Sequence, residues 1–339
     1  MKPHCIPPSS GNERISSTRR WLGLALGVFL TAMPLVPFAQ SAFPTKPITI
    51  VIGSPAGGTQ DLQARALQEP LQKILGQPIV IENRAGASGN VATVYVARST
   101  PDGHTLFLAN NPFVISPNLG ANAGFDPVKD FVPVTVISLA PMVLMVHQSL
   151  DARSTRELVD LAKASPGKLE FGSAGVTSFG RMTTELFSRL AGVQMLHVPY
   201  QGSSQTTTAL ATGEIKVLVS TLTAPLVGFA KEGKVRILGV SSAKPSPLLP
   251  GVPAIADAVP GFSAEVWSGI VAPVGTPPAA VARLQAAFAQ ALALPEVRER
   301  FAIIGVTPSF GPSDEFASRL LRERADWARV IREANIKAD

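Results

Sequence analysis

Ile48-Thr49-Ile50-Val51-Ile52, followed by Gly53-Ser54-Pro55-Ala56-Gly57-Gly58-Thr59-Gln60-Asp61, is the stretch of this 339-residue chain that says most about its fold. The five apolar, largely β-branched residues are typical of a buried strand. The next nine are rich in glycine and lead into Leu62–Leu75, where apolar residues recur at helical spacing. Such a turn presents backbone N–H groups at the positive end of a helix dipole, so it can bind anions, including carboxylates, without a charged side chain.

The same turn does not match the common nucleotide-binding motifs. It lacks the lysine of a P-loop, and its glycines are not spaced as in dinucleotide-binding folds. The sequence therefore predicts an anion site of a kind that does not serve nucleotides.

Residues 1–41 are predicted to be a cleaved signal peptide. A basic start is followed by an apolar run over residues 21–38, and Ala39-Gln40-Ser41 has the small-x-small pattern of a cleavage site. A membrane anchor is the alternative, but the run is short and is broken by Pro34 and Pro37. Cleavage would start the mature chain near Ala42, and the export route, Sec or twin-arginine, stays open.

Export changes how the cysteine and the charge are interpreted. Cys5 is the one cysteine, so the mature chain would have no disulfide, thiol nucleophile or cysteine metal site. Removal of residues 1–41 takes away four basic residues and one acidic residue, and the formal net charge falls from +6 to +3. Nucleic-acid binding is therefore not expected.

Short β-branched runs alternate with helical patterns, which predicts an α/β fold with mostly parallel sheets. The predicted strands are Ile48–Ile52, Ile79–Glu82, Thr105–Ala109, Leu169–Phe171, Met195–Val198, Ile215–Val219 and Val235–Val240. The predicted helices are Leu62–Leu75, Ser154–Ala164, Phe179–Leu190, Ser203–Ala211, Pro277–Leu294 and Asp314–Glu333.

Two apolar runs without helical periodicity mark where the chain could cross between two domains. They lie at 131–146 and at 264–272. We expect one lobe to comprise residues 43–137 plus 262–339 and the other residues 138–261. Two crossovers between two α/β lobes would form a hinge with a cleft between the lobes.

Ligands of open α/β sheets bind beyond the carboxyl ends of the strands. The residues that follow the predicted strands are therefore candidate ligand-binding residues: Pro55, Ala56, Gly57, Gly58, Thr59, Asn110, Ser173, Ala174, Gly175, Thr177, Tyr200, Gly202, Ser203 and Thr221. Arg181 is a further candidate, because a cation is disfavoured in the first turn of a helix unless an anion binds there. A solvated surface arginine is the alternative.

The other candidates also have structural alternatives. Glycines often follow strands because the turn requires a positive φ. We interpret Asp61 as a helix-capping residue rather than a general base, and Tyr200 either hydrogen-bonds a ligand or lines the cleft. The turn Asn83–Asn90 is assigned a mainly structural role, because Glu82 and Arg84 can pair with each other.

The motifs of common enzymes are missing from the sequence. There is no HExxH or GxSxG motif, and His104, His147 and His197 are not at metal-ligand spacing. A serine hydrolase using Ser173 or Ser178 would need a base and an orienting acid that the sequence does not place. We therefore expect no catalytic activity, no bound metal and no cofactor.

Several motifs resemble, in the same order, those of the Bug family of extracytoplasmic solute receptors. They are Lys46-Pro47-Ile48, Pro55-Ala56-Gly57-Gly58-Thr59-x-Asp61, Gly76-Gln77-Pro78, Glu82-Asn83-Arg84-x-Gly86-x-x-Gly89-Asn90, Pro101-Asp102-Gly103-x-Thr105, Asp126-Pro127-x-Lys129-Asp130-Phe131 and His197-Val198-Pro199-Tyr200-x-Gly202. The resemblance extends from Phe43 to Trp327.

The resemblance implies a two-lobed periplasmic binding protein that closes on a carboxylate. In this family the turns matching Pro55–Thr59 and Gly172–Ser178 hold the carboxylate, partly through backbone amides and waters. It further implies that the permease subunits of a tripartite tricarboxylate transporter are the partners, and we expect a monomer.

Three departures from the family pattern bear on the ligand. Arg181 stands where the family often has histidine, and Ser220 and Thr221 stand where it often has aspartate and asparagine. Without that aspartate an amino-acid ligand is less expected, and Arg181 favours a second acidic group. Val176–Phe179 also differs from the usual glycine-rich continuation, which suggests a smaller or more apolar pocket.

The sequence thus predicts an exported solute-binding protein for a small organic carboxylate. Two alternatives remain open at this stage: a ligand-sensing receptor for a signalling partner, and a cleft hydrolase or isomerase that uses the same anion hole.

Overall fold

Strand β1 (Ile48–Ile52) shows how alternating side chains build the first sheet. The computed structural model describes residues 43–119, 123–175 and 178–337. Ile48, Ile50 and Ile52 pack into one hydrophobic cluster with the helices of one face, and Val51 joins a cluster on the other face. Because both faces are covered, every residue of the strand except Thr49 is apolar and buried.

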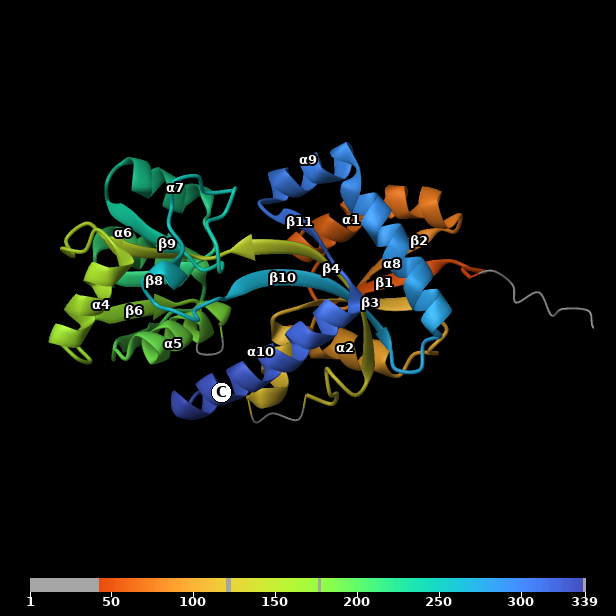
Figure 1. Cartoon of the computed structure of the whole chain (residues 1–339), viewed down its shortest axis with the longest axis horizontal. Coiled ribbons are helices and arrows are strands. Elements are labelled where there is room, and N and C mark those ends of the chain that lie inside the picture. Colours follow the sequence, from red (N-terminus) through yellow and green to blue (C-terminus); the bar gives the residue numbers. More distant parts are fainter. Residues whose placement is uncertain (1–42, 120–122, 176–177, 338–339) are drawn as a thin grey trace, which may run out of the picture. The chain divides into compact units, whose positions relative to one another are not determined.

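The first sheet has six strands in the order β11-β4-β10-β3-β1-β2 (Figure 1). Their bounds are β2 Ile79–Asn83, β3 Thr105–Asn110, β4 Phe131–Pro141, β10 Glu265–Pro273 and β11 Thr307–Gly311. β1 pairs in parallel with β2 and β3, whereas β10 runs antiparallel to both β3 and β4, and β11 runs antiparallel to β4.

The second sheet has five strands in the order β7-β6-β8-β5-β9. Their bounds are β5 Val143–His147, β6 Glu170–Ser173, β7 Leu196–Pro199, β8 Val217–Ser220 and β9 Val235–Val240. β6 pairs in parallel with β7 and β8, and β5 is antiparallel to β8 and β9. The α/β prediction is confirmed, but the expectation of mostly parallel sheets is wrong. The first sheet has two parallel and three antiparallel pairings and the second has two of each, because β4, β5 and β10, which were interpreted only as crossover runs, join the sheets as antiparallel strands.

Helices cover the faces of both sheets. Their bounds are α1 Thr59–Leu75, α2 Asn90–Ala97, α3 Pro112–Ile115, α4 Thr155–Ala164, α5 Phe179–Ala191, α6 Ser203–Thr212, α7 Ala224–Lys231, α8 Pro278–Ala293, α9 Pro295–Ile304 and α10 Ser313–Glu333. Three 3₁₀ turns occur at Ala87–Gly89, Ser116–Asn118 and Ile255–Asp257. Local signals place several ends: the Ser154 hydroxyl accepts the Glu157 N–H at 3.2 Å to begin α4, and left-handed Gly192 ends α5.

The chain passes from one sheet to the other at two neighbouring places. β4 ends at Pro141 and β5 begins at Val143; on the return, β9 ends at Val240 and β10 begins at Glu265. The two passages are hydrogen-bonded to each other, because the Ser241 N–H donates to the Met142 carbonyl and the Met142 N–H donates to the Ser241 hydroxyl, both at 2.8 Å. The lobe limits expected at 137/138 and 261/262 stay a prediction.

Candidate functional site

Three adjacent parallel strands in each sheet bring their following turns to one edge. In the first sheet β2, β1 and β3 are neighbours, and in the second β7, β6 and β8 are neighbours. Five of these six strands lead directly into a turn and then a helix, and β2 leads through a turn and a 3₁₀ turn into α2. Each sheet therefore presents helix N-termini at the carboxyl ends of three parallel strands, the arrangement that favours binding of an anion.

The turn after β1 already contains an internal anion. The Asp61 carboxylate is 2% exposed; its Oδ2 accepts the Gly57 N–H at 3.0 Å and pairs with Arg65 Nε at 2.8 Å. The hydrogen bond from Arg65 lowers the pKa of Asp61, with a further contribution from the Gly57 amide. The capping role predicted for Asp61 fits this geometry, and the Gly57 amide has an internal partner.

The turns after β1 and β2 touch at two glycines. A Cβ on Gly53 would lie 2.7 Å from the Gly89 Cα, so no larger side chain fits there without moving backbone. Next to this contact is a cavity of about 420 Å³. It is lined by Gly53, Ser54, Pro55, Gln60, Ala85, Gly86, Ala87, Gly89, Asn90, Thr93, Phe107, Asn110, Pro112 and Phe113.

This cavity brings together two of the candidates, Pro55 and Asn110, and adds residues that the sequence interpretation left out. The turn Asn83–Asn90, assigned a structural role, contributes Ala85, Gly86 and Ala87 to the lining. Its strand-to-helix glycine pattern was the available signal, because it has the same form as the turn after β1. The expected pairing of Glu82 with Arg84 is present, with Arg84 Nε 2.6 Å from Glu82 Oε1.

The turn after β6 is organised around Ser173 and His197. Ser173 is 1% exposed, and its hydroxyl donates to the Gly175 carbonyl at 2.8 Å while lying 2.7 Å from His197 Nε2. Since the hydroxyl proton is used at Gly175, Nε2 of the imidazole must carry the proton of the second bond. Burial, assisted by the nearby Arg181 charge, lowers the pKa of His197 to about 4, so the ring is neutral at pH 7.

Arg181 lies in the first turn of α5 beside an acid. Its Nε is 3.6 Å from Glu185 Oε1, and the two side chains are 12% and 20% exposed. Burial raises the pKa of Glu185 even though Arg181 opposes that shift. The Ser178 hydroxyl caps the helix by accepting the Arg181 backbone N–H at 3.3 Å. A half-buried cation therefore sits at a helix N-terminus next to the Ser173 turn, an environment suited to an acidic ligand group.

The remaining candidates lie in the turns beyond the carboxyl ends of the parallel strands. Ala56, Gly57, Thr59, Ala174, Ser203 and Thr221 are exposed, whereas Gly58, Gly175 and Gly202 are half-buried. The Tyr200 hydroxyl donates to Glu214 Oε1 at 2.8 Å, and burial with this acceptor raises the pKa of Tyr200 to about 12. Thr177 lies outside the described residues.

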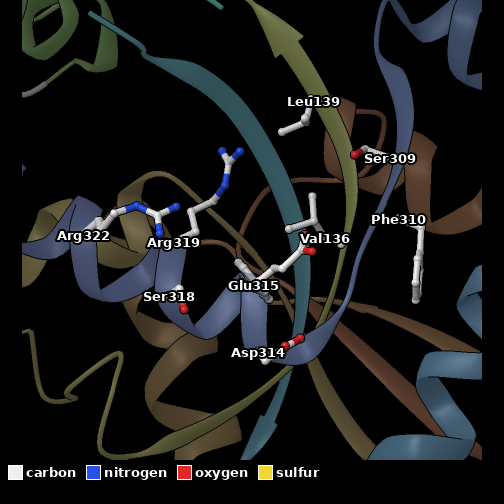
Figure 2. A pocket seen from close by; sticks show the side chains of 11 residues that line it. Val136, Leu139, Ser309, Phe310, Asp314, Glu315, Ser318, Arg319 and Arg322 are labelled. Atoms are coloured by element: carbon white, nitrogen blue, oxygen red, sulfur yellow. The ribbon is translucent and has the colours of Figure 1, made fainter. Parts of the chain in front are cut away.

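A second cavity, of about 540 Å³, lies between β4, β11 and the first half of α10. Figure 2 shows Arg319 and Arg322 extending from α10 above Asp314 and Glu315, with Phe310 pointing away from them. None of the candidate residues lines this cavity. Its acidic and basic side chains offset one another, so it selects no ligand charge.

The described residues were also considered for a metal site and for a membrane-spanning helix. No group of three or more histidine, aspartate or glutamate side chains in this part of the chain could hold a metal ion. Within the same residues, every helix is too short or too polar to cross a lipid bilayer.

Comparison with known proteins places the chain in a family. A model described as tripartite tricarboxylate transporter family receptor matches residues 63–336. Protein BugT of Bordetella pertussis is 33% identical over 316 residues, which cover 92% of this chain and 97% of that protein. The solved structure of R. palustris Rpa4515 with adipate is 34% identical, with a TM-score of 0.68, over 87% of this chain and 99% of that chain.

A further solved structure, MatC (Rpa3494) from Rhodopseudomonas palustris with bound malate, is 30% identical with a TM-score of 0.64. It covers 85% of this chain and 100% of its own. The matched family consists of transporter receptors, which confirms the resemblance and the expectation that the chain is not an enzyme. The chain therefore belongs to the tripartite tricarboxylate transporter receptor family and is a two-lobed α/β solute-binding protein.

Proposed function

We propose that this receptor captures a small organic carboxylate between its two lobes in the periplasm and delivers it to the permease subunits of a tripartite tricarboxylate transporter. One observation carries the proposal: turns after three parallel strands in each sheet end at helix N-termini, and a half-buried Arg181 stands at one of them. Backbone amides at Ala56–Thr59 and Ser173–Thr177 would hold one carboxylate, apart from the Gly57 and Gly58 amides, which already donate to Asp61 and to the Pro55 carbonyl. Arg181 would hold a second acidic group.

The ligand drives closure only through its preference for the closed form. A ligand that binds both forms equally shifts no population, whereas one that contacts both lobes favours closure. The closed receptor would be the form that the permease recognises. Relatives bound to adipate and to malate favour dicarboxylates as the class to test first.

Thermal unfolding with a panel of acids tests the ligand class. The panel contains adipate, malate, benzoate and a monocarboxylate of matched length. At a ligand concentration about 100 times Kd, binding stabilises the folded state by roughly 2.7 kcal/mol. We expect the dicarboxylates to give the largest rise in Tm.

Arg181→Ala should remove most of that dicarboxylate-dependent rise. Arg189→Ala is a matched control, because Arg189 is on the same helix and pairs with Glu333 at 3.8 Å, away from the turn. Equal responses of the two variants and the wild type would show that Arg181 does not bind ligand. A panel without any response would contradict the carboxylate proposal itself.

The localisation rests on residues 1–41, which we propose are removed on export. N-terminal sequencing of the protein from the periplasm should begin near Ala42. Uptake of labelled ligand by cells that lack the receptor, with and without its return, tests delivery to the permease. A sensory role would leave uptake unchanged and alter transcription instead.

A further inference from the structure

Helix α10 contacts structural elements of both sheets. In its first half the Phe316 ring lies edge-on to Trp267 of β10, with ring centroids 5.3 Å apart. Gly269 of β10 accommodates this ring, because a Cβ there would be 2.5 Å from Phe316 Cζ. Toward its other end, Trp327 meets Phe179, the first residue of α5, with centroids 5.4 Å apart.

Glu323 lies between these two contacts on α10. Its Oε2 accepts the Trp267 indole N–H at 2.8 Å, and its Oε1 is 3.5 Å from an Arg319 guanidinium nitrogen. Arg319 in turn lies 3.7 Å from Glu265 Oε2 at the start of β10. Glu323 and Trp327 are four residues apart on the helix and so share one face.

The same strand, β10, is tied to the turn after β3 by Asn111. This side chain is 2% exposed, donates to the Glu265 carbonyl at 3.0 Å and accepts the Trp267 backbone N–H at 3.2 Å. Asn111 directly follows Asn110, one of the candidate residues in the first sheet. On the other side, Phe179 directly follows Ser178, at the end of the turn after β6.

We propose that Glu323 is a positioning residue for ligand binding, which aligns the turn after β3 with the start of α5 in the ligand-free form through Trp267 and Asn111 on one side and Trp327 and Phe179 on the other. The proposal rests on the proposed function for its ligand, although the mechanical coupling exists without one. The alignment limits the relative motion of the two half-sites without preventing closure, which lowers the ordering cost of binding and so raises affinity.

Removal of the carboxylate should loosen both ends of this connection. Glu323→Ala leaves the Trp267 indole N–H without its acceptor, and leaves Arg319 with Glu265 as its remaining partner, inside a largely buried cluster. Glu323→Gln keeps an oxygen for the indole and serves as the conservative variant. Glu333→Gln, which affects the more exposed pair with Arg189 at the end of α10, is the matched control.

Hydrogen–deuterium exchange of the ligand-free protein tests the coupling. In Glu323→Ala the amides of residues 179–184 and 266–270 should exchange about tenfold faster, whereas those of α1 stay unchanged. Glu323→Gln should stay within about threefold of wild type, and Glu333→Gln should match it. Unchanged exchange at 179–184 in Glu323→Ala would overturn the proposal.

A second variant covers the case in which Glu323→Ala unfolds α10. Trp327→Leu leaves both partners of the Glu323–Trp267 hydrogen bond in place and removes the ring contact to Phe179. It should accelerate exchange at 179–184 without affecting 266–270. Equal acceleration at both places, or none at 179–184, contradicts the proposed route.

Tryptophan fluorescence supplies the ligand readout. The chain has three tryptophans, and Trp21 lies in the segment predicted to be cleaved. The tryptophan fluorescence of the mature protein would therefore come from Trp267 and Trp327, which both belong to this network. Titration with adipate and with malate should give a Kd about tenfold weaker in Glu323→Ala than in Glu323→Gln. If neither acid binds the wild type, the proposed ligand class fails while the exchange data still decide the coupling.

Discussion

The turn after β1 and the turn after β6 share a sequence pattern but differ in their electrostatics. Both join a parallel strand to a helix through glycine and small residues. The first contains a buried carboxylate, Asp61, that accepts a hydrogen bond from the Gly57 amide and forms an ion pair with Arg65. The second contains a neutral His197 on Ser173 and a cation, Arg181, in the helical turn.

The comparison shows that a glycine-rich strand–turn–helix unit does not by itself determine the charge of its site. The first turn is close to charge-neutral, so it would contribute backbone amides and the shape of the cavity. The second also has an internal pair, Arg181 with Glu185, but here the arginine rather than the acid lies in the first helical turn, so it would contribute the attraction for a second acidic group. Single substitutions in or beside each turn test this difference.

Asp61→Asn should have the largest effect on stability. The substitution keeps the volume but removes the charge that Arg65 and Gly57 contact, which should lower the free energy of unfolding by about 2 kcal/mol at pH 7. Urea denaturation measures the loss. Arg65→Ala is the control; its side chain is 49% exposed, and it should lose only about 0.5 kcal/mol.

The pH dependence of this loss has a definite sign. The pKa of Asp61 is lowered in the folded state, so its stabilisation is present above the ordinary aspartate range near pH 3.9 and disappears as the pH falls through the lowered pKa. Wild type and Asp61→Asn should therefore converge in acid. A constant difference down to pH 2 would contradict the proposed role of the carboxylate.

Gly53→Ala should have the next largest effect, because it separates the turns that line the cavity in the first sheet. The new Cβ would lie 2.7 Å from the Gly89 backbone, and the required shift should cost about 1.5 kcal/mol. Urea denaturation again measures it. Gly202→Ala in the second sheet has open space and an extended φ of 172°, so a comparable loss there would show that the close contact is not the cause.

His197→Gln should give the smallest change, visible only in acid. The folded-state pKa near 4 lies below the ordinary 6.5, so the unfolded chain takes up the proton first and wild-type stability falls as the pH drops from 6.5 to 4. Solvent screening reduces this loss to about 1 kcal/mol by pH 4.5. Glutamine can keep a donor for Ser173 but does not titrate, so its Tm should vary less across this range.

Seven of the eleven strands and six of the ten α-helices in the described residues were predicted from local patterns. β4, β5 and β10 were interpreted only as apolar crossover runs, and no bounds were predicted for α2, α3 and α7. β1 and β9 match their predicted bounds. β11 was missed because Pro308 argues against a strand, yet proline is tolerated on this edge strand. α9 was missed because it begins at Pro295 immediately after the extended Leu294 that ends α8.

The candidate site was predictable as a set of turns but not as a set of contacts. Pro55 and Asn110 were expected in the site because each follows a predicted strand, and one cavity contains both. Ser173 was expected as a ligand donor, whereas its hydroxyl proton is engaged by Gly175. The charged groups of each turn lie on the helix that follows it, whereas the partner of the Ser173 hydroxyl, His197, comes from the neighbouring strand β7.

The sequence by itself determined the α/β alternation, the glycine turns at the strand ends and the family, because these depend on residues within a few positions of one another. Only the tertiary structure decided that His197 reaches Ser173, that Gly89 meets Gly53 and that Glu323 receives Trp267. These pairs are separated by 24 to 56 residues along the chain, and only the packing of sheets and helices sets their distances.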